Sequence, residues 1–300
     1  MKKSVSLLLA ALMLTGALAG CGSSASTTSD AQADGNADSG VSGAITVISR
    51  EDGSGTRGAF IELTGVEEKT ADGKKVDNTT ADAEIANKTD VVLTSVAGNE
   101  KAIGYISLGA LNDTVKAVKV DGAEPTVDNV KAGTYKLSRP FNIATKGEPT
   151  GVAKDFINFI FSKEGQAVVA DNHCIAVDDA AESFVSDGSS GQIAVGGSSS
   201  VSPVMEKLIE AYKSVNPNAS IDLQTSDSTS GMTGAMDGTF AIGMASRELK
   251  DEEAAELTGT TIALDGIAVI VNPANTIDEL SMDQIKSIYV GDITDWGELA

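Results

Sequence analysis

The sequence predicts an α/β fold with open sheets. Short apolar stretches typical of buried strands alternate with helical patterns from about residue 45 onward. Four of the predicted strands end in turns of small residues, which contain Ser54, Ser199, Ser228 and Ser246. Because ligands of open α/β sheets bind at the carboxyl ends of the strands, these turns form the candidate site.

The first strand is expected at residues 45–48, which are apolar at alternate positions. A glycine-rich turn follows, Arg50-Glu51-Asp52-Gly53-Ser54-Gly55-Thr56-Arg57-Gly58, and residues 59–63 have the pattern of a first helix. The N–H groups of such a turn lack partners and lie at the positive end of the helix dipole, so the turn favours an anion. One arginine among small hydroxyls indicates a tetrahedral oxyanion rather than a large organic ligand.

The same turn also matches the Gly-x-Gly-x-x-Gly pattern of dinucleotide sites. That interpretation needs an acidic residue about twenty positions further on, at the end of a second strand. Residues 67–75 are instead expected to form a polar loop. Asp52 would also repel a pyrophosphate without a proton, so the nucleotide interpretation is disfavoured.

The remaining elements continue the alternation. Strands are expected at 102–106, 115–120, 139–145, 193–196, 221–223, 240–244 and 262–271. Helices are expected at 89–97 (capped by Thr89), 151–161, 163–171, 201–212, 251–256 and around 285–289, and one more follows the turn at 226–231 and ends at 236. Residues 178–192 are rich in Ser, Gly, Asp and Ala and are expected to be a linker.

The N-terminus has the pattern of a secretory signal over residues 1–20. Lys2 and Lys3 precede an apolar run at 5–14, which is too short to span a bilayer. The run ends in Leu18-Ala19-Gly20-Cys21, which resembles the lipobox of bacterial lipoproteins, where the cysteine carries the lipid, palmitate among its acyl chains. A plain signal peptide is the alternative. Residues 21–43 have almost no bulky apolar side chain and are expected to be a flexible tether.

Charge and composition exclude several classes of partner. The formal net charge is −21, which argues against nucleic acid and anionic membrane surfaces. It does not exclude a small anion, because surface charge is screened within about 10 Å at ordinary salt. A hydrophobic content of 41% is enough for a folded core.

The sequence also offers little for catalysis. Cys21 and Cys174 are the only cysteines and His173 is the only histidine. No internal disulfide, Cys-based metal site or two-His metal site is therefore expected, and any Ser-His-Asp triad would need His173. We expect a binding protein without cofactor or metal rather than an enzyme, with Cys174 buried as a small apolar side chain.

Seven stretches together resemble a known family, the PstS-type phosphate-binding proteins of phosphate-uptake ABC transporters. They are the turn at 50–57 and residues 102–109, 137–140, 197–203, 228–231, 243–249 and 263–273. The resemblance covers nearly everything from Ile45 to Leu299. It implies a two-lobed periplasmic-binding-protein-like (type II) fold, in which a hinge joins the lobes and phosphate binds in the cleft between them.

The order of the segments differs from that family. There, the segment similar to 197–203 opens the mature protein, whereas here it follows the linker at 178–192, so the chain is interpreted as circularly permuted. One lobe would comprise 45–137 plus 267–300, and the other 138–266. In the family, the segment similar to 295–299 runs on into the one similar to 45–58. The new chain ends are therefore expected to be neighbours, with Ile45 and Ala300 close together. The alternative is a truncated or fused gene product whose halves pair with another chain.

The resemblance also implies a set of phosphate-binding residues. They are Arg50, Asp52, Ser54, Gly55, Thr56, Ser199, Ser200, Ser228 and Ser246. Asp52 is expected to accept the proton that phosphate carries and sulfate lacks. Many relatives have a second carboxylate where this chain has Ser246, and Asp227 could substitute for it, although a turn role suits Asp227 better.

These implications define the expected function. The protein is expected to be an extracytoplasmic, lipid-anchored monomer that delivers phosphate to an ABC permease and touches the membrane only through its anchor. The alternatives are a protein that binds another tetrahedral oxyanion (sulfate, molybdate or tungstate), a phosphate-sensing surface protein, and a surface phosphatase. The last would need a metal or an activated nucleophile, and the sequence offers neither.

Overall fold

The computed structural model describes residues 41–299, and its fold is α/β, as predicted. The strands are β1 Thr46–Arg50, β2 Glu67–Lys69, β3 Lys75–Asp77, β4 Glu84–Ala86, β5 Ala102–Ser107, β6 Lys116–Ala117, β7 Lys119–Val120, β8 Ser138–Thr145, β9 Ile175–Ala176, β10 Gly191–Ser198, β11 Ala219–Ser226, β12 Ile242–Ala245, β13 Thr258–Val271 and β14 Glu279–Leu280. The helices are α1 Gly55–Thr64, α2 Thr89–Ala97, α3 Val127–Lys131, α4 Gly151–Ile160, α5 Lys163–Asp171, α6 Ser202–Val215, α7 Ser228–Asp237, α8 Asp251–Ala254 and α9 Met282–Val290, with short 3-10 turns at Leu108–Ala110 and Trp296–Leu299.

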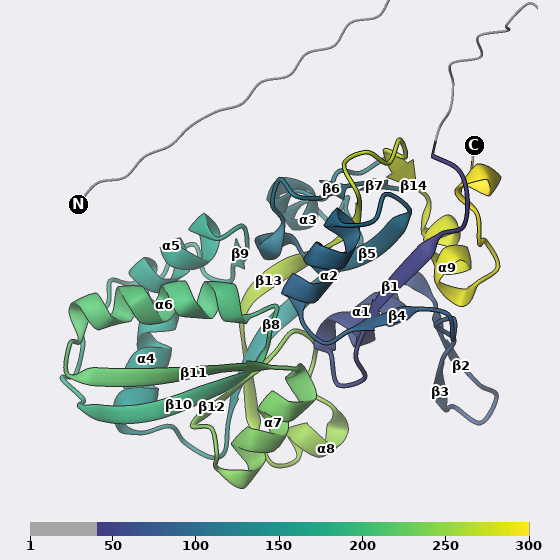
Figure 1. The fold of residues 1–300 in the computed structure, drawn as a ribbon. Coiled ribbons are helices and arrows are strands. Elements are labelled where there is room, and N and C mark those ends of the chain that lie inside the picture. The colour runs from purple at the N-terminus through teal and green to yellow at the C-terminus, as the bar shows by residue number, and fades with distance from the viewer. Residues whose placement is uncertain (1–40, 300) are drawn as a thin grey trace, which may run out of the picture. The chain divides into compact units, whose positions relative to one another are not determined.

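Within these residues, one ten-stranded sheet carries the fold, with the path β11-β10-β12-β8-β13-β5-β1-β4 and with β6 and β9 paired to β13. Strands at the two ends of the path are parallel: β10 to β11 and β12, and β1 to β4 and β5. The strands between them, β8 and β13, are antiparallel to each other and to their neighbours. In Figure 1, β8 and β13 run between the group around β1 and β5 and the group around β10 to β12.

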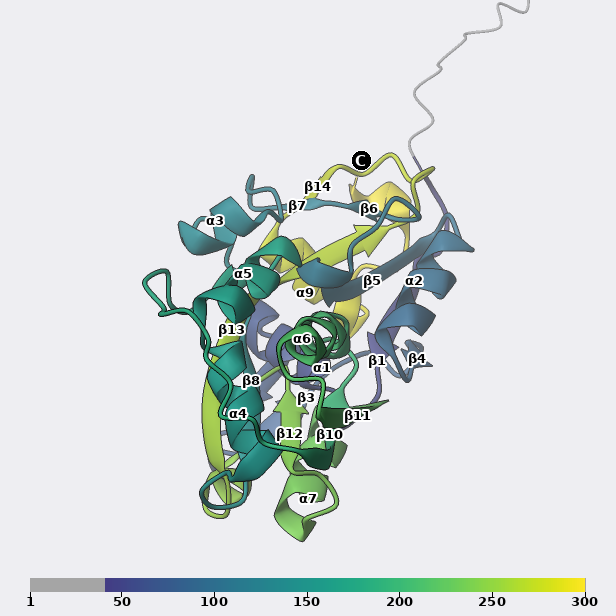
Figure 2. The same ribbon diagram turned by 90° about the vertical axis from the view of Figure 1, so that its left-hand side faces the viewer.

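The buried apolar residues divide between these two groups. One core contains Phe60, Tyr105 and the β13 segment 267–271, and the other contains Phe141, Met205 and Ile262 at the other end of β13. Figure 2 views α6 nearly end-on, above the strands of the second group. The long strand β13 thus belongs to both cores and links them.

The two ends of the described chain lie side by side. The Ile45 amide donates to the Thr294 carbonyl at 2.8 Å, and Ala44 forms an antiparallel bridge with Asp295. This agrees with the predicted proximity of the chain ends, although Ala300 itself lies outside the described residues. The signal peptide, Cys21 and the tether up to residue 40 also lie outside them.

The described residues include the last part of the predicted tether. The Val41 amide donates to Thr276 Oγ1 at 2.8 Å, and the Gly43 amide donates to Asp295 Oδ1 at 2.9 Å. These last residues of the predicted tether therefore pack against the C-terminal segment. No helix between residues 41 and 299 is long and apolar enough to cross a membrane.

Two local predictions were wrong. Residues 67–77 form a hairpin of β2 and β3 rather than a loop, and ion pairs hold it, including Lys75 to Glu67 at 2.8 Å and Arg57 to Asp77 at 2.8 Å. Both strands are largely exposed, so their sequence carries no apolar alternation. Helix α2 has the predicted bounds, but Lys88 rather than Thr89 occupies the N-cap position and provides no side-chain cap.

The segment predicted as a linker, 178–192, is held against α4 and α6. The Asp155 carboxylate, 1% exposed, accepts hydrogen bonds from Ser186 Oγ at 2.7 Å, the Asp187 amide at 2.9 Å and Tyr212 Oη at 2.7 Å. The Phe184 ring packs edge-on against Phe159. Strand β10 then begins at Gly191, inside the predicted linker.

Candidate functional site

The four predicted serine turns lie together where strands meet helices. Strands β1, β10, β11 and β12 end at the turns, and α1, α6 and α7 begin there, with the start of α2 beside them. Each helix N-terminus has amide groups without helical partners, and a positive partial charge. The N-cap residues of α2 and α6, Lys88 and Val201, provide no side-chain cap, and the first amide of α2 donates instead to Ser199 Oγ at 3.4 Å. The structure therefore directs several helix N-termini toward one place.

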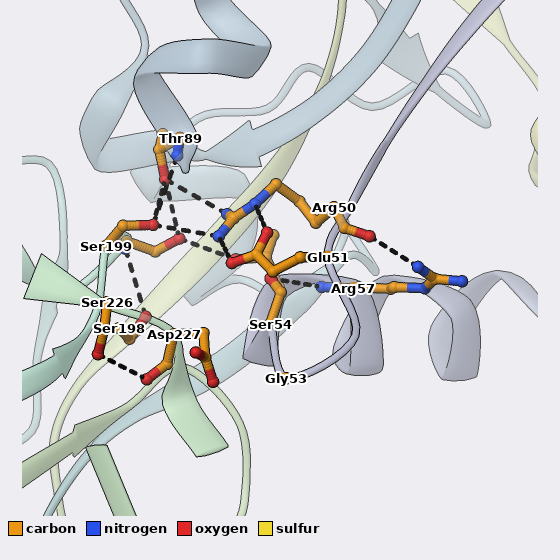
Figure 3. Close-up of polar contacts among 12 residues, drawn as sticks. Arg50, Glu51, Gly53, Ser54, Arg57, Thr89, Ser198, Ser199, Ser226 and Asp227 are labelled. Carbon is orange, nitrogen blue, oxygen red and sulfur yellow. Dashed lines mark hydrogen bonds and ion pairs between the residues drawn. The ribbon is translucent and has the colours of Figure 1, made fainter. Parts of the chain in front are cut away.

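Arg50, at the end of β1, is the buried cation of this site. Its side chain is only 2% exposed. Its Nη2 donates to Ser199 Oγ at 3.2 Å, and its Nη1 lies 3.5 Å from Thr89 Oγ1. Figure 3 shows the guanidinium pointing at the hydroxyls of these residues, which come from the start of α2 and the turn after β10.

Aromatic packing fixes the backbone that carries Arg50. The Arg50 amide donates to the Tyr105 hydroxyl at 3.1 Å, and the Tyr105 ring stacks on Phe60 with ring centroids 3.9 Å apart. Burial raises the pKa of Tyr105, so its hydroxyl stays protonated and can donate to Ser49 Oγ, 2.9 Å away. Arg57 Nη1 donates to the Arg50 carbonyl at 2.7 Å. These contacts aim the guanidinium before any ligand arrives.

Hydroxyl groups surround the guanidinium, and we call the whole set the Arg50 cluster. It consists of Arg50, Thr56, Thr89, Ser198, Ser199, Ser200, Ser228 and Ser246, each at most 6% exposed. Thr56 Oγ1 lies 2.8 Å from Ser200 Oγ, and Ser198 Oγ donates to Ser246 Oγ at 3.0 Å. The Ser246 amide donates to Ser228 Oγ at 3.1 Å. Because hydroxyls both donate and accept, they can exchange these mutual bonds for bonds to an anion.

The turn between β1 and α1 approaches the opposite turns too closely for larger side chains. A Cβ on Gly55 would collide with Ser228 Oγ and Ser246 Oγ, so only glycine fits there. Ser54 caps α1 by accepting from the Arg57 amide at 3.3 Å. The structure thus brings together Arg50, Gly55, Thr56 and the five predicted serines, which are Ser54, Ser199, Ser200, Ser228 and Ser246.

Asp52 does not join them, which corrects the sequence prediction. Its side chain is 102% exposed and pairs with Arg57 at 3.2 Å. The turn directs Asp52 outward, while Arg57 lies between it and the backbone of Arg50. A fully exposed carboxylate cannot enforce the selection of a protonated anion, because water competes for its hydrogen bonds.

Three residues of the site were missed. Glu51 receives two hydrogen bonds from the Arg50 guanidinium, at 2.8 Å from Nε and 2.8 Å from Nη2. The Thr89 amide and hydroxyl lie 3.4 and 3.3 Å from Ser199 Oγ. Thr89 was placed at a helix start, which is a signal for an anion site, and Ser198 stands in the same serine run as Ser199.

Asp227 proved to be a turn residue, because it caps α7 by accepting from the Ser230 amide at 2.9 Å.

A second buried arginine lies where the two cores meet. Arg139 on β8 pairs with Asp265 on β13 at 3.1 Å, and Ser107 Oγ donates to the same carboxylate at 2.8 Å. Burial lowers the pKa of Arg139 and raises that of Asp265, and their mutual attraction opposes both shifts. Among buried side-chain nitrogens and oxygens of residues 41–299, only Arg139 Nη1 lacks a partner.

The arrangement suits binding of a small oxyanion. It combines one buried cation, several hydroxyl donors and helix N-termini, which together favour tetrahedral anions. In the part of the chain that the structure describes, no three His, Cys, Asp or Glu side chains gather as a metal site would require. Cys174 is buried at 2% exposure, and burial raises the pKa of its thiol, so it stays an inert apolar side chain.

A family model described as a PBP superfamily domain matches residues 24–164 and 183–300. The fold and site therefore define the chain as a member of the PBP superfamily. The Phosphate-binding protein PstS 2 of Streptococcus agalactiae is 48% identical over 99% of this chain and 98% of its own length. The Phosphate-binding protein PstS 2 of Streptococcus pneumoniae is 45% identical over the full length of both chains.

A solved structure agrees with these sequences. The crystal structure of a phosphate-binding protein of a phosphate ABC transporter from Streptococcus pneumoniae matches with a TM-score of 0.69 and 48% identity, over 86% of this chain and 100% of that one. Within the superfamily, this chain belongs to the PstS-type family of phosphate-binding proteins. Its members are named as binding proteins, which confirms the expectation that the chain is not an enzyme.

Proposed function

We propose that this protein binds inorganic phosphate in the Arg50 cluster. The observation that carries the proposal is the burial of the Arg50 guanidinium among hydroxyls that come from turns far apart in the sequence. Glu51 holds the Nε and Nη2 edge of this guanidinium, while Nη1 and Nη2 reach the hydroxyls, where they could bind two oxygens of one phosphate. The names of the relatives support phosphate as that anion.

The proposed ligands are those that the sequence predicted, without Asp52. They are Arg50, Ser54, Gly55, Thr56, Ser199, Ser200, Ser228 and Ser246. Arg50 supplies charge, the serines and Thr56 supply hydroxyl donors, and Gly55 lets the α1 amides approach the anion. In the described structure several of these hydroxyls bond each other directly, so binding phosphate requires the turns to separate slightly.

Transport is the biological role that follows from this binding. We propose that the protein acts outside the cytoplasm as a lipid-anchored monomer, held through Cys21 and the tether, and that it delivers phosphate to an ABC permease. The signal-like N-terminus and the printed title of the solved relative support this role. A binding protein for sulfate or molybdate is the rival function.

We further propose that the chain is circularly permuted, with lobes at 45–137 plus 267–300 and at 138–266. The adjacent chain ends and the anchored linker at 178–192 support this. The relatives from Streptococcus align with this chain over almost their whole length, so they share its order of segments.

A thermal-shift series tests the proposed ligand. The protein is dialysed free of phosphate and heated alone or with phosphate, arsenate, sulfate or molybdate. We expect phosphate and arsenate to raise the Tm by several degrees, because a ligand that binds only the folded state stabilises it. A rise with sulfate or molybdate and none with phosphate would refute the assignment.

A further inference from the structure

We infer that Thr229 is a positioning residue of the anion site, which holds the turn after β1 against the turn after β11 and thereby sets the affinity for phosphate. This inference rests on the proposed function. Thr229 is the second residue of α7 and follows Ser228, whereas its partner Gly53 precedes Ser54. The contact therefore joins the two turns next to proposed ligands, and neither of its residues is itself a proposed ligand.

Two hydrogen bonds make the Thr229–Gly53 contact. The Thr229 amide and the Thr229 hydroxyl each donate to the Gly53 carbonyl oxygen, both at 3.2 Å. A carbonyl oxygen has two lone pairs, so these bonds use the full capacity of that acceptor. Because the two residues are 176 positions apart in the chain, the bonds hold the two strand groups of the sheet at one separation beside the Arg50 cluster.

An ion pair fixes the orientation of the Thr229 hydroxyl. Arg247 Nη2 donates to Thr229 Oγ1 at 3.2 Å. The same guanidinium is held by Glu253, through Nη1 to Oε2 at 2.7 Å and Nη2 to Oε1 at 2.8 Å. The side chains of Arg247 and Glu253 are only 12% and 3% exposed. Since the hydroxyl oxygen accepts from Arg247, its own proton is directed to the Gly53 carbonyl.

The facing turns leave no room for a side chain at Gly53. A Cβ there would collide with Asp227 Oδ1, and the Asp227 side chain is held in place because it caps α7. The φ angle of Gly53 is not positive, so its backbone would accept alanine. Gly53→Ala is therefore expected to force the turns apart while every proposed ligand keeps its identity. Figure 3 labels Gly53 and Asp227 on these two turns.

The Thr229–Gly53 contact needs no anion, because it consists of protein groups that satisfy each other. It therefore stabilises the arrangement in which both turns face one anion. A ligand loses apparent affinity when the arrangement that binds it is only partly populated. Loss of the contact should thus weaken phosphate binding and let the phosphate-free protein open.

The test compares Thr229→Val, which removes the hydroxyl and keeps the shape, with Thr233→Val, an exposed threonine one turn further along α7. Titration calorimetry gives the Kd of phosphate, and small-angle X-ray scattering gives the radius of gyration with and without saturating phosphate. We expect Thr229→Val to raise the Kd about two- to tenfold, the range of one neutral hydrogen bond. Its phosphate-free radius should exceed that of the wild type, and saturating phosphate should restore the wild-type value. Thr229→Ser keeps the hydroxyl and should behave as the wild type, as should Thr233→Val.

Gly53→Ala tests the same contact from the other turn, and it decides the question if Thr229→Val does not fold. Its control is Gly58→Ala, since a Cβ on Gly58 would meet Arg247 Cδ at an ordinary contact distance of 3.9 Å. Gly53→Ala should enlarge the phosphate-free radius and raise the phosphate Kd at least as much as Thr229→Val. Gly58→Ala should leave both quantities unchanged.

The outcomes separate this inference from the proposed function. If the wild type binds phosphate and Thr229→Val and Gly53→Ala match their controls in Kd and radius, Thr229 does not position the site, and phosphate binding still stands. A Thr229→Val variant that unfolds at lower urea concentration but keeps the wild-type Kd and radius has lost only stability, which also overturns the inference. If the wild type binds no phosphate, both the proposed function and the inference fail.

Discussion

Thr56 Oγ1 and Ser200 Oγ lie 2.8 Å apart although 144 positions separate them in the chain. Thr56 is the second residue of α1, which follows β1, and Ser200 follows β10, so this contact joins the two strand groups of the sheet. Both hydroxyls are almost fully buried, at 1% and 3% exposure. An anion bound between the turns would replace this hydroxyl pair with two hydrogen bonds of its own.

A double-mutant cycle of Thr56→Val and Ser200→Ala tests that idea. Each single change should weaken phosphate binding by about 1.5–3 kcal/mol, the value of a hydrogen bond to a charged group. Since a shared phosphate links the two hydroxyls, we expect a coupling energy of at least about 0.5 kcal/mol in calorimetric titrations. Additive effects with no coupling would mean that the two hydroxyls do not contact one anion.

Arg50→Lys should weaken phosphate binding by about 2–4 kcal/mol, because lysine keeps the charge but loses the planar fork. The Kd from titration calorimetry measures this. Lys207→Met is the control, since Lys207 is exposed and pairs with Glu210 on α6, away from the site. A loss in Lys207→Met and none in Arg50→Lys, which keeps the charge, would indicate that only the overall charge of the protein matters.

Asp155→Asn should destabilise the protein at neutral pH but have less effect in acid. Burial raises the pKa of Asp155, but its hydrogen bonds from Asp187, Tyr212, Ser186 and Asn216 outweigh burial and hold the pKa below its ordinary value. A lowered pKa contributes stability above the unfolded-state pKa of about 3.9, and that stability is lost as pH falls through the folded-state pKa.

The expected cost of Asp155→Asn is about 1–3 kcal/mol at pH 7, measured by urea unfolding. The difference from the wild type should shrink at about pH 3, where the wild-type carboxylate begins to take up protons. Asp179→Asn, an exposed acid in the same linker, serves as control. An equal difference at both pH values would show that the charge of Asp155 is not what holds the linker.

Arg139→Met should destabilise the fold by about 3–5 kcal/mol, because it leaves the Asp265 carboxylate buried without its cation. The double variant Arg139→Met with Asp265→Leu removes both charges and should regain part of that loss. Urea unfolding of the two variants and the wild type measures both effects. A double variant that is less stable than the single one would contradict this account of the pair.

The sequence predicted the strand and helix alternation well because the core residues follow clear periods. Val204, Met205 and Leu208 repeat at helical spacing on α6 and are all buried. The serine turns were also predictable, since small residues at strand ends are characteristic of ligand sites in α/β sheets. Gly55 was predictable as a site residue for the same reason, since it lies in one of these turns. In the structure its neighbours leave no room for a larger side chain.

The sequence predictions failed where the direction in which a side chain points, rather than its residue type, determines its contacts. Glu51 and Asp52 are adjacent acids in one turn, and only the course of the backbone determines which of them faces Arg50. The hairpin of β2 and β3 was missed because its stability comes from ion pairs such as Lys286 to Glu68, which leave no apolar pattern in the sequence. Both errors concern surface or turn residues, where periodicity carries no information.

The most direct test of the central claim is a calorimetric titration of phosphate into the protein after exhaustive dialysis. Phosphate binding at the Arg50 cluster predicts one saturable site per chain, with a Kd for phosphate well below that for sulfate. It also predicts that Arg50→Lys weakens the same transition. If the wild type showed no heat of phosphate binding, or if Arg50→Lys left the phosphate binding isotherm unchanged, phosphate binding at the Arg50 cluster would be contradicted.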